Sequence, residues 1–176
     1  METRFEKNIA DKKISLGTII TLSDLCVSEL AGDCGMDFCW IDAEHAPHTI
    51  ETVHRHLIAL RGTGCAGLVR VRANDPMLIK PYLDLAPTGV IIPMVNTAEE
   101  AEKAVAACRY PTTVIRGCGV RRAVRYGAED FFDYVKRSET EPMVIIQIEH
   151  IDAVRNLDEI LEVPGTIGIL QIMDCV

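Results

Sequence analysis

The segment that decides the fold is Phe38-Cys39-Trp40-Ile41-Asp42-Ala43-Glu44-His45-Ala46-Pro47. Its first four residues form an apolar run, and such runs are typical of buried strands in a parallel sheet. Sheets of this kind carry their chemistry just beyond the carboxyl ends of the strands. Asp42, Glu44 and His45 stand at that point. The segment therefore predicts a buried strand that delivers two carboxylates and an imidazole to one edge of a sheet.

Two interpretations of these polar residues are open on the segment alone. A His three residues after an Asp can act as a general acid/base whose imidazole is held in one orientation by the carboxylate. The alternative is a polar turn between a strand and a helix, in which Asp42 or Glu44 accepts hydrogen bonds from backbone amides.

Further apolar runs on both sides of this segment alternate with helical patterns. We expect strands at residues 16–22, 38–42, 67–71, 89–94, 143–148 and 166–172. We expect helices at residues 27–34, 50–61, 75–86, 97–108 and 152–161, with another near Phe131. Asp75-Pro76, and Thr97 with Glu100, are typical helix-start signals. The β/α alternation predicts a parallel α/β sheet with right-handed crossovers.

The 176 residues are enough for one domain, and we predict a single domain over residues 1–176, because the sequence has no repeat or low-complexity linker. An eight-stranded α/β barrel typically takes about 250 residues, so six strands suggest an incomplete barrel. A doubly wound open sheet would fit the length better. However, no Gly-rich phosphate loop follows the first expected strand.

Composition excludes several classes of function. The net charge is −8 and no basic block occurs, so we expect neither nucleic acid nor an anionic membrane as a partner. The charged N-terminus does not resemble a secretory signal, and no apolar run reaches the roughly 20 residues of a membrane span. We therefore expect a cytoplasmic protein. The seven cysteines include no CxxC pair, and we expect most of them to be small buried residues.

Two other strands carry polar residues that need a partner. Arg70 stands between apolar residues, which indicates an anionic partner: an internal salt bridge to Asp42 or Glu149, or a bound carboxylate or enolate. Gln147 and Glu149 share one face of the fifth strand. A carboxylate at that strand's end suits Mg²⁺ or Mn²⁺, and Asp174 is the acid available after the sixth strand.

The other histidines receive less weight. His54 and His56 are two residues apart on a helix, so they point to different faces, and we expect both at the surface. His48 lies near the expected site and His150 follows Glu149 directly; either could support a site residue, but we expect both to be solvated loop residues.

Six motifs together resemble the HpcH/HpaI aldolase family. They are Ile41-Asp42-Ala43-Glu44-His45, Leu68-Val69-Arg70-Val71, Asn74-Asp75-Pro76, Ile92-Pro93-Met94-Val95, Arg116-Gly117 and Gln147-Ile148-Glu149. They occur in the family's order, and the resemblance extends from about Gly17 to Leu170. The family contains metal-dependent, pyruvate-using class II aldolases, such as 2-dehydro-3-deoxyglucarate and 4-hydroxy-2-oxoheptanedioate aldolases.

The resemblance implies a TIM-type barrel, here an incomplete one of about six parallel strands. It also implies an aldolase that cleaves a small 4-hydroxy-2-oxoacid into pyruvate, or a close relative, and an aldehyde. Glu149 and Asp174 would hold a divalent metal ion (Mg²⁺, Mn²⁺ or Co²⁺). Arg70 and Gln147 would bind the substrate, with Arg70 stabilising the enolate oxygen. His45, oriented by Asp42, would move the proton of the aldol hydroxyl.

The chain also departs from the family pattern. Where relatives have Gly-Pro-x-Asp after the sixth strand, this sequence has Ile172-Met173-Asp174-Cys175. The last two strands and the C-terminal helices, which support homo-oligomers in relatives, are missing from the pattern. The alternative is therefore a catalytically inactive truncated homologue, or an assembly partner of a full-length aldolase. An acyl-CoA lyase of the citrate-lyase type is less favoured.

Overall fold

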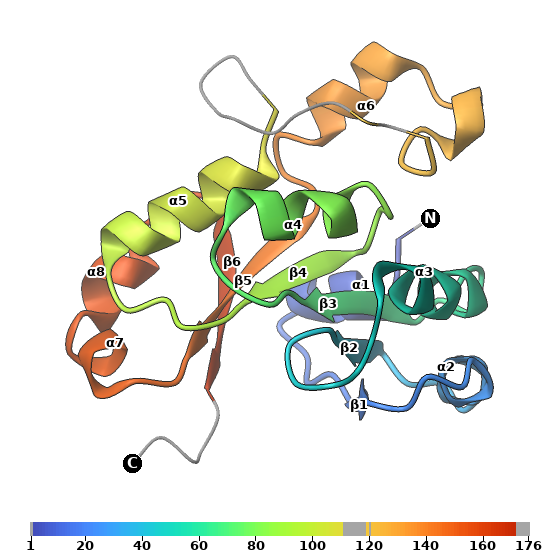
Figure 1. The fold of residues 1–176 in the computed structure, drawn as a ribbon, viewed down its shortest axis with the longest axis horizontal. Coiled ribbons are helices and arrows are strands. Elements are labelled where there is room, and N and C mark those ends of the chain that lie inside the picture. Colours follow the sequence, from blue (N-terminus) through green and yellow to red (C-terminus); the bar gives the residue numbers. More distant parts are fainter. Residues whose placement is uncertain (1, 111–118, 120, 172–176) are drawn as a thin grey trace. The chain divides into compact units, whose positions relative to one another are not determined.

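The computed structural model describes residues 2–110, 119 and 121–171 (Figure 1). The chain divides into two compact units, Met1–Arg70 and Val71–Val176. Within the described residues, each unit contains three parallel strands. The parallel α/β arrangement that the sequence predicts is confirmed within each unit, whereas the single domain stays a prediction.

The first unit is a three-stranded sheet with helices. Its strands are β1 (Gly17–Ile20), β2 (Phe38–Asp42) and β3 (Ala66–Arg70), and its helices are α1 (Arg4–Ala10), α2 (Cys26–Asp33) and α3 (Ile50–Ala59). Strand β2 lies between β1 and β3. The register places Asp42 beside Arg70. Helix α2 contacts β1, β2 and α3, and α3 contacts β3. This packing buries the apolar runs of β2 and β3.

Helix α1 is an element that the sequence pattern did not predict. It begins with a capping box between Thr3 and Glu6. The Arg4 guanidinium donates to the carbonyls of Thr63 (2.7 Å) and Met36 (2.6 Å), which precede β3 and β2. Seven residues are too few to show a clear helical period, and α1 has no buried residue. It is held at the amino ends of the strands by these hydrogen bonds and by the Phe5 ring, whose centre lies 5.1 Å from that of Phe38 in β2.

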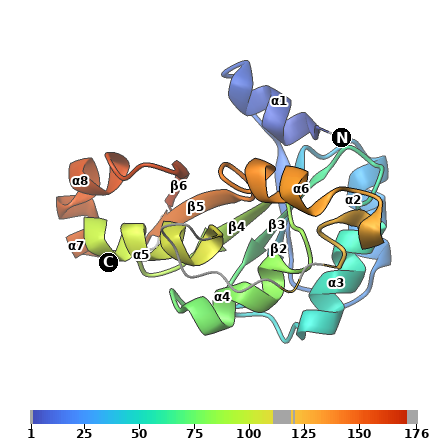
Figure 2. The same cartoon turned by 90° about the horizontal axis from the view of Figure 1, so that it is seen from above.

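The second unit repeats the same scheme. Its strands are β4 (Gly89–Ile92), β5 (Met143–Ile148) and β6 (Thr166–Gln171), with β5 between the other two. Its helices are α4 (Pro76–Leu83), α5 (Ala98–Cys108), the 3-10 turn η1 (Arg125–Gly127), α6 (Phe131–Arg137), α7 (Ile151–Arg155) and α8 (Leu157–Leu161). Helix α5 packs beside α4 and α8 (Figure 2).

The local signals at helix starts are confirmed, and one helix differs from its prediction. The Asp75 side chain accepts the N–H of Met77 (2.7 Å), as expected for the start of α4. Thr97 is the N-cap of α5, as predicted, but the Glu100 carboxylate accepts the N–H of Asn96 (2.6 Å) in place of the Thr97 N–H that a capping box would use. The helix expected at residues 152–161 is instead two short helices, α7 and α8, divided at Asn156. The Asn156 side chain donates to the Asn96 carbonyl (2.8 Å), and its backbone leaves the helical region at ψ 14°.

In the described part of the chain, no helix has the length and apolar character needed to cross a membrane.

Candidate functional site

In the first unit, the candidate site is built on the carboxyl ends of β2 and β3. Neighbouring parallel strands place paired residues on the same face, and Asp42 pairs with Arg70. The Arg70 guanidinium donates to both oxygens of the Asp42 carboxylate, from Nε to Oδ1 (3.0 Å) and from Nη2 to Oδ2 (2.6 Å). The guanidinium carbon of Arg70, Cζ, lies 4.8 Å from the centre of the Trp40 ring. The anionic partner expected for Arg70 is therefore Asp42, one of the internal salt bridges that the sequence left open.

The Asp42 carboxylate also holds the turn that follows β2. Its Oδ1 accepts the backbone N–H groups of Glu44 (3.0 Å) and His45 (3.2 Å). Burial alone would raise the pKa of Asp42. The hydrogen bonds from Arg70 and from the amides of His45 and Glu44 outweigh burial, so the pKa lies below its ordinary value. Asp42 is thus an ionised carboxylate that accepts hydrogen bonds from backbone amides, as one of the two initial interpretations expected.

The contact between Asp42 and His45 differs from the expected one. Asp42 meets the backbone of His45, whereas the imidazole Nε2 lies 3.6 Å from Glu44 Oε2. The same Glu44 oxygen is 3.3 Å from Arg70 Nε. Because the guanidinium and two amides surround the Asp42 carboxylate, Glu44 is the acid beside the ring. The His45 side chain is 70% exposed, so solvent reaches its imidazole. The sequence pattern pointed to Asp42, three residues before His45, and gave no sign that the neighbouring Glu44 contacts the imidazole.

Two histidines are buried where the sequence predicted solvent. His56 and His48 are both fully buried, and their ring centres lie 5.2 Å apart. The Nδ1 atom of His56 is 2.9 Å from the Ser28 hydroxyl in α2. Burial, with His48 next to it, lowers the pKa of His56. The prediction was wrong because α3 turns His56 toward α2 together with Val53 and Leu57.

In the second unit, the candidate site lies after β5. Gln147 is fully buried, and its Nε2 donates to Glu149 Oε2 (2.8 Å). The backbone N–H of Met94, in the turn after β4, donates to Glu149 Oε1 (2.7 Å). The contact between Gln147 and Glu149 agrees with their predicted common face. Asp174, the other predicted metal ligand, lies outside the described residues, as does Arg116.

The residues around Glu149 fit a hard divalent cation. The donor set is oxygen-only, and each carboxylate oxygen keeps a lone pair beside its hydrogen bond. Gln147 Oε1 is buried, and no hydrogen-bond donor among the described residues reaches it. No group of three His, Cys, Asp or Glu side chains with metal-site geometry occurs in the described part of the chain. This is compatible with Mg²⁺, which is usually held by one or two carboxylates and completes its shell with water or substrate.

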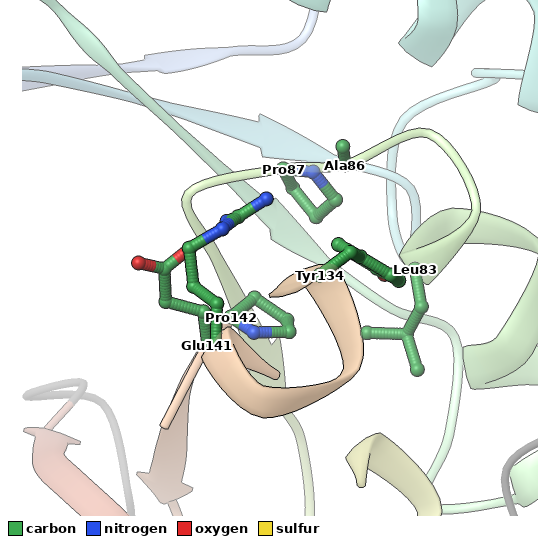
Figure 3. A pocket seen from close by; sticks show the side chains of 7 residues that line it. Leu83, Ala86, Pro87, Tyr134, Glu141 and Pro142 are labelled. Carbon is green, nitrogen blue, oxygen red and sulfur yellow. The ribbon is translucent and has the colours of Figure 1, made fainter. Parts of the chain in front are cut away.

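A small pocket of the second unit lies at the opposite ends of its strands (Figure 3). Pro87 and Pro142, which precede β4 and β5, line it together with Tyr134, Arg137 and Glu141. Its empty volume is about 290 Å³, including open solvent. Arg137 forms ion pairs with Glu129 and Glu141. Since Glu149 follows the carboxyl end of β5, this pocket is separate from the candidate site.

The described cysteines are free thiols, and three of the five are buried, in line with the prediction that most cysteines are buried. Cys39, Cys65 and Cys108 are buried, and Cys26 and Cys34 are exposed. The Sγ atoms of Cys39 and Cys65 lie 3.8 Å apart. Cys39 pairs with Gly67 in the register, and Cys65 directly precedes β3.

Comparison with known proteins places this arrangement in a family. The 5-keto-4-deoxy-D-glucarate aldolase of Escherichia coli O139:H28 is 39% identical over 167 residues, which are 94% of this chain and 64% of that protein. The chain thus spans less than two thirds of the length of this relative.

Solved structures agree with the sequence comparison. An HpcH/HpaI aldolase from Desulfitobacterium hafniense DCB-2 superposes with a TM-score of 0.87 at 26% identity, covering 95% of this chain and 65% of that one. A citrate synthase, SbnG, superposes with a TM-score of 0.82 at 25% identity, covering 94% and 64%. The predicted fold class, an α/β fold of the TIM-barrel type, is confirmed over the part of these structures that the chain covers. Residues 21–171 match the family description HpcH/HpaI aldolase/citrate lyase. The chain belongs to the HpcH/HpaI aldolase/citrate lyase family.

Proposed function

We propose that this chain acts as a metal-dependent carbon–carbon lyase, an aldolase that cleaves a 4-hydroxy-2-oxoacid into pyruvate, or a close relative, and an aldehyde. The observation that supports this best is the Arg70 guanidinium, held through two hydrogen bonds by Asp42 and laid over Trp40 at the end of β3. A cation fixed in this way is a preorganised partner for an oxyanion that develops during a reaction. The aldolase name of the 39% identical relative supports the same reaction class.

The residues of the first unit suit the proton and charge movements of aldol cleavage. A base takes the proton of the C4 hydroxyl, the bond between C3 and C4 breaks, and its electron pair becomes the enolate of pyruvate. We assign the base to His45, acting through water, because its imidazole is exposed and lies beside Glu44. Arg70 then stabilises the enolate oxygen. The enolate takes a proton at C3 to give pyruvate.

Residues of the second unit would hold the metal ion and the substrate. We propose Glu149 as a ligand, Asp174 as a second ligand, and Gln147 as a contact to the substrate. A bound divalent ion, Mg²⁺, Mn²⁺ or Co²⁺, supplies a Lewis acid that withdraws charge from the keto oxygen. Glu149 is fixed for this role by its hydrogen bonds from Gln147 and Met94. The proposal includes a small 2-oxoacid as the ligand and a cytoplasmic location.

The test is pyruvate release by the purified chain from 5-keto-4-deoxy-D-glucarate in the presence of Mn²⁺. We expect turnover that EDTA abolishes, that Arg70→Ala lowers by about 10²–10³-fold, and that His45→Ala lowers by about 10²–10⁴-fold. Arg55→Ala, on the exposed face of α3, is the matched control and keeps wild-type turnover. Pyruvate release that persists in EDTA or in the Arg70 variant would overturn the mechanism.

A second candidate function is that of an inactive assembly partner of a full-length aldolase. One observation favours it. Within residues 1–70, β1 pairs with β2, and the chain around β1 exposes Leu16 (66%), Ile19 (52%) and Leu22 (62%). Exposed apolar side chains beside a strand are typical of a surface that another chain covers. Light scattering after size-exclusion chromatography, with and without a full-length relative, would show a mixed complex if this alternative holds.

A further inference from the structure

The turn after β4 contains a residue in an unfavourable backbone conformation. Met94 has φ +54°, and its side chain is 51% exposed. Residues with a Cβ atom rarely adopt the left-handed region, because Cβ approaches the following carbonyl oxygen. Such conformations persist where the surrounding structure holds them, and they gather at functional sites. The strain at Met94 therefore needs a compensating contact.

That contact is the hydrogen bond from the Met94 N–H to Glu149 Oε1. The turn that presents the amide is held at a second point, two residues further on. The Asn96 N–H donates to the Glu100 carboxylate (2.6 Å), and the Asn96 carbonyl accepts from the Asn156 side chain (2.8 Å). Helices α5 and α8 thus anchor the turn, and the direction of the Met94 N–H is fixed by their positions.

The other oxygen of Glu149 is held by a buried side chain. A carboxylate can only accept hydrogen bonds, so the amide of Gln147 must turn its NH₂ group toward Glu149 Oε2. This orientation directs Gln147 Oε1 away from the carboxylate. Oε1 is buried, and no donor among the described residues reaches it. A buried amide oxygen without a donor indicates a water or ligand that supplies one.

We propose that Met94 and Gln147 are positioning residues that together orient Glu149 for a divalent cation, and that Gln147 Oε1 accepts a hydrogen bond from water in the cation's shell. The proposal rests on the proposed function, since it concerns the same metal site. It adds a reason for the strained backbone at Met94: in this turn the residue's own N–H reaches the Glu149 carboxylate. Partners of this kind orient a ligand, and their removal typically weakens metal binding by about 10–100-fold.

The test measures Mn²⁺ affinity of the full chain by electron paramagnetic resonance, with Mn²⁺ alone as the probe. Gln147→Met keeps the length and burial of the side chain and removes both its donor and its acceptor. Met94→Val places a β-branched residue at φ +54°, which forces the turn and its N–H to move. We expect the dissociation constant for Mn²⁺ to rise by about 10–100-fold in each variant. Met94→Gly, which accepts this φ without strain, should bind Mn²⁺ as the wild type does.

The matched control is Ala86, a second left-handed residue of the same unit, at φ +52° in the pocket away from Glu149. Ala86→Val introduces the same strain and lowers the thermal midpoint, but Mn²⁺ affinity should not change. If Met94→Val and Ala86→Val both lower the thermal midpoint and neither changes Mn²⁺ affinity, the role of Met94 is structural and the proposal is wrong. The Gln147 variant and the glycine variant keep the test decisive if Met94→Val does not fold.

The outcomes also separate this proposal from the proposed function. Wild-type chain that binds no more Mn²⁺ than Glu149→Ala would overturn the metal site and, with it, the positioning roles. Wild-type binding that Glu149→Ala abolishes, with unchanged affinity in Gln147→Met and Met94→Val, would overturn the positioning roles alone.

Discussion

Each unit carries a carboxylate at the carboxyl end of a parallel strand, but Asp42 is buried whereas Glu149 is partly exposed, and the two are held differently. Asp42 in the first unit is bound by the Arg70 guanidinium, and both side chains are at least nine-tenths buried. Glu149 in the second unit is held, among the described residues, by neutral donors, the Met94 amide and the Gln147 side chain. The charge of the Asp42 carboxylate is therefore neutralised by Arg70, whereas the Glu149 carboxylate is oriented by its hydrogen bonds without a positive partner among the described residues.

This difference decides what each carboxylate can do. An ion pair with good geometry compensates the charge of Asp42, and a further cation would gain little there. Neutral N–H donors orient Glu149 but leave its negative charge in place, so a divalent cation can supply the missing positive charge. We infer that Asp42 serves to position Arg70 and the turn at His45, and that Glu149 is the carboxylate suited to a metal ion.

The largest expected effect comes from breaking the ion pair. Arg70→Ala leaves the Asp42 carboxylate buried without its cation, which typically costs about 3–5 kcal/mol in the free energy of unfolding. Urea denaturation measures this loss. Arg55→Ala is the matched control, because it removes an exposed ion pair with Glu51, typically about 0–1 kcal/mol. Equal losses in the two variants would show that burial does not distinguish the Asp42 site.

A bound cation should stabilise the second site. At 100 times its dissociation constant, a ligand adds about 2.7 kcal/mol to the free energy of unfolding. We expect Mn²⁺ to raise the thermal midpoint of the wild type and of Glu102→Gln, an exposed change on α5. Glu149→Gln should show no such rise. If Mn²⁺ stabilises the Glu149 variant as much as the wild type, the cation binds elsewhere.

The ion pair also predicts a dependence of stability on pH. The pKa of Asp42 in the folded chain is lowered below its unfolded value of about 3.9. Its contribution is therefore fully present above about pH 4 and is lost as the pH falls through the folded pKa. The free energy of unfolding should fall more steeply in acid for the wild type than for Asp42→Asn. Urea midpoints between pH 7 and pH 3 measure this, and parallel curves would contradict it.

The smallest effect is expected for Glu149→Gln without metal. A glutamine can accept the Met94 N–H through its carbonyl oxygen, and the Gln147 amide can turn over to accept a hydrogen bond. The free energy of unfolding should change by only about 1 kcal/mol, the range of one neutral hydrogen bond. Urea denaturation in EDTA measures it. A loss as large as that of Arg70→Ala would mean that the two carboxylates do not differ.

The positions of most elements could be predicted from the sequence, because their causes are local. The apolar runs became strands within a few residues of their predicted ends, and Asp75-Pro76 begins α4 as its capping chemistry requires. Helix α1 could not be predicted, since it is held by the contacts of Arg4 with distant carbonyls. The division between α7 and α8 likewise depends on Asn156 and its distant partner Asn96.

The candidate site shows the same limit. Asp42, Arg70, Gln147 and Glu149 stand at or just beyond the ends of their strands, where alternation along an apolar run predicts them. The partners of these side chains were harder to predict from the sequence. The spacing of Asp42 and His45 suggested a contact within the turn, but the nearest cation to Asp42 is 28 residues away. Nothing in the sequence indicated the left-handed Met94, because side chains with a Cβ atom disfavour that conformation.

The sequence by itself determined the parallel α/β elements, the family and the residues that stand at the strand ends. These depend on hydrophobic periodicity, on turn chemistry and on motif order, all of which can be read along the chain. Only the tertiary structure decided that Arg70 neutralises Asp42, that His56 is buried, and that Met94 and Gln147 orient Glu149. Strand pairing and helix packing bring these groups together across long stretches of chain, so no local pattern encodes them.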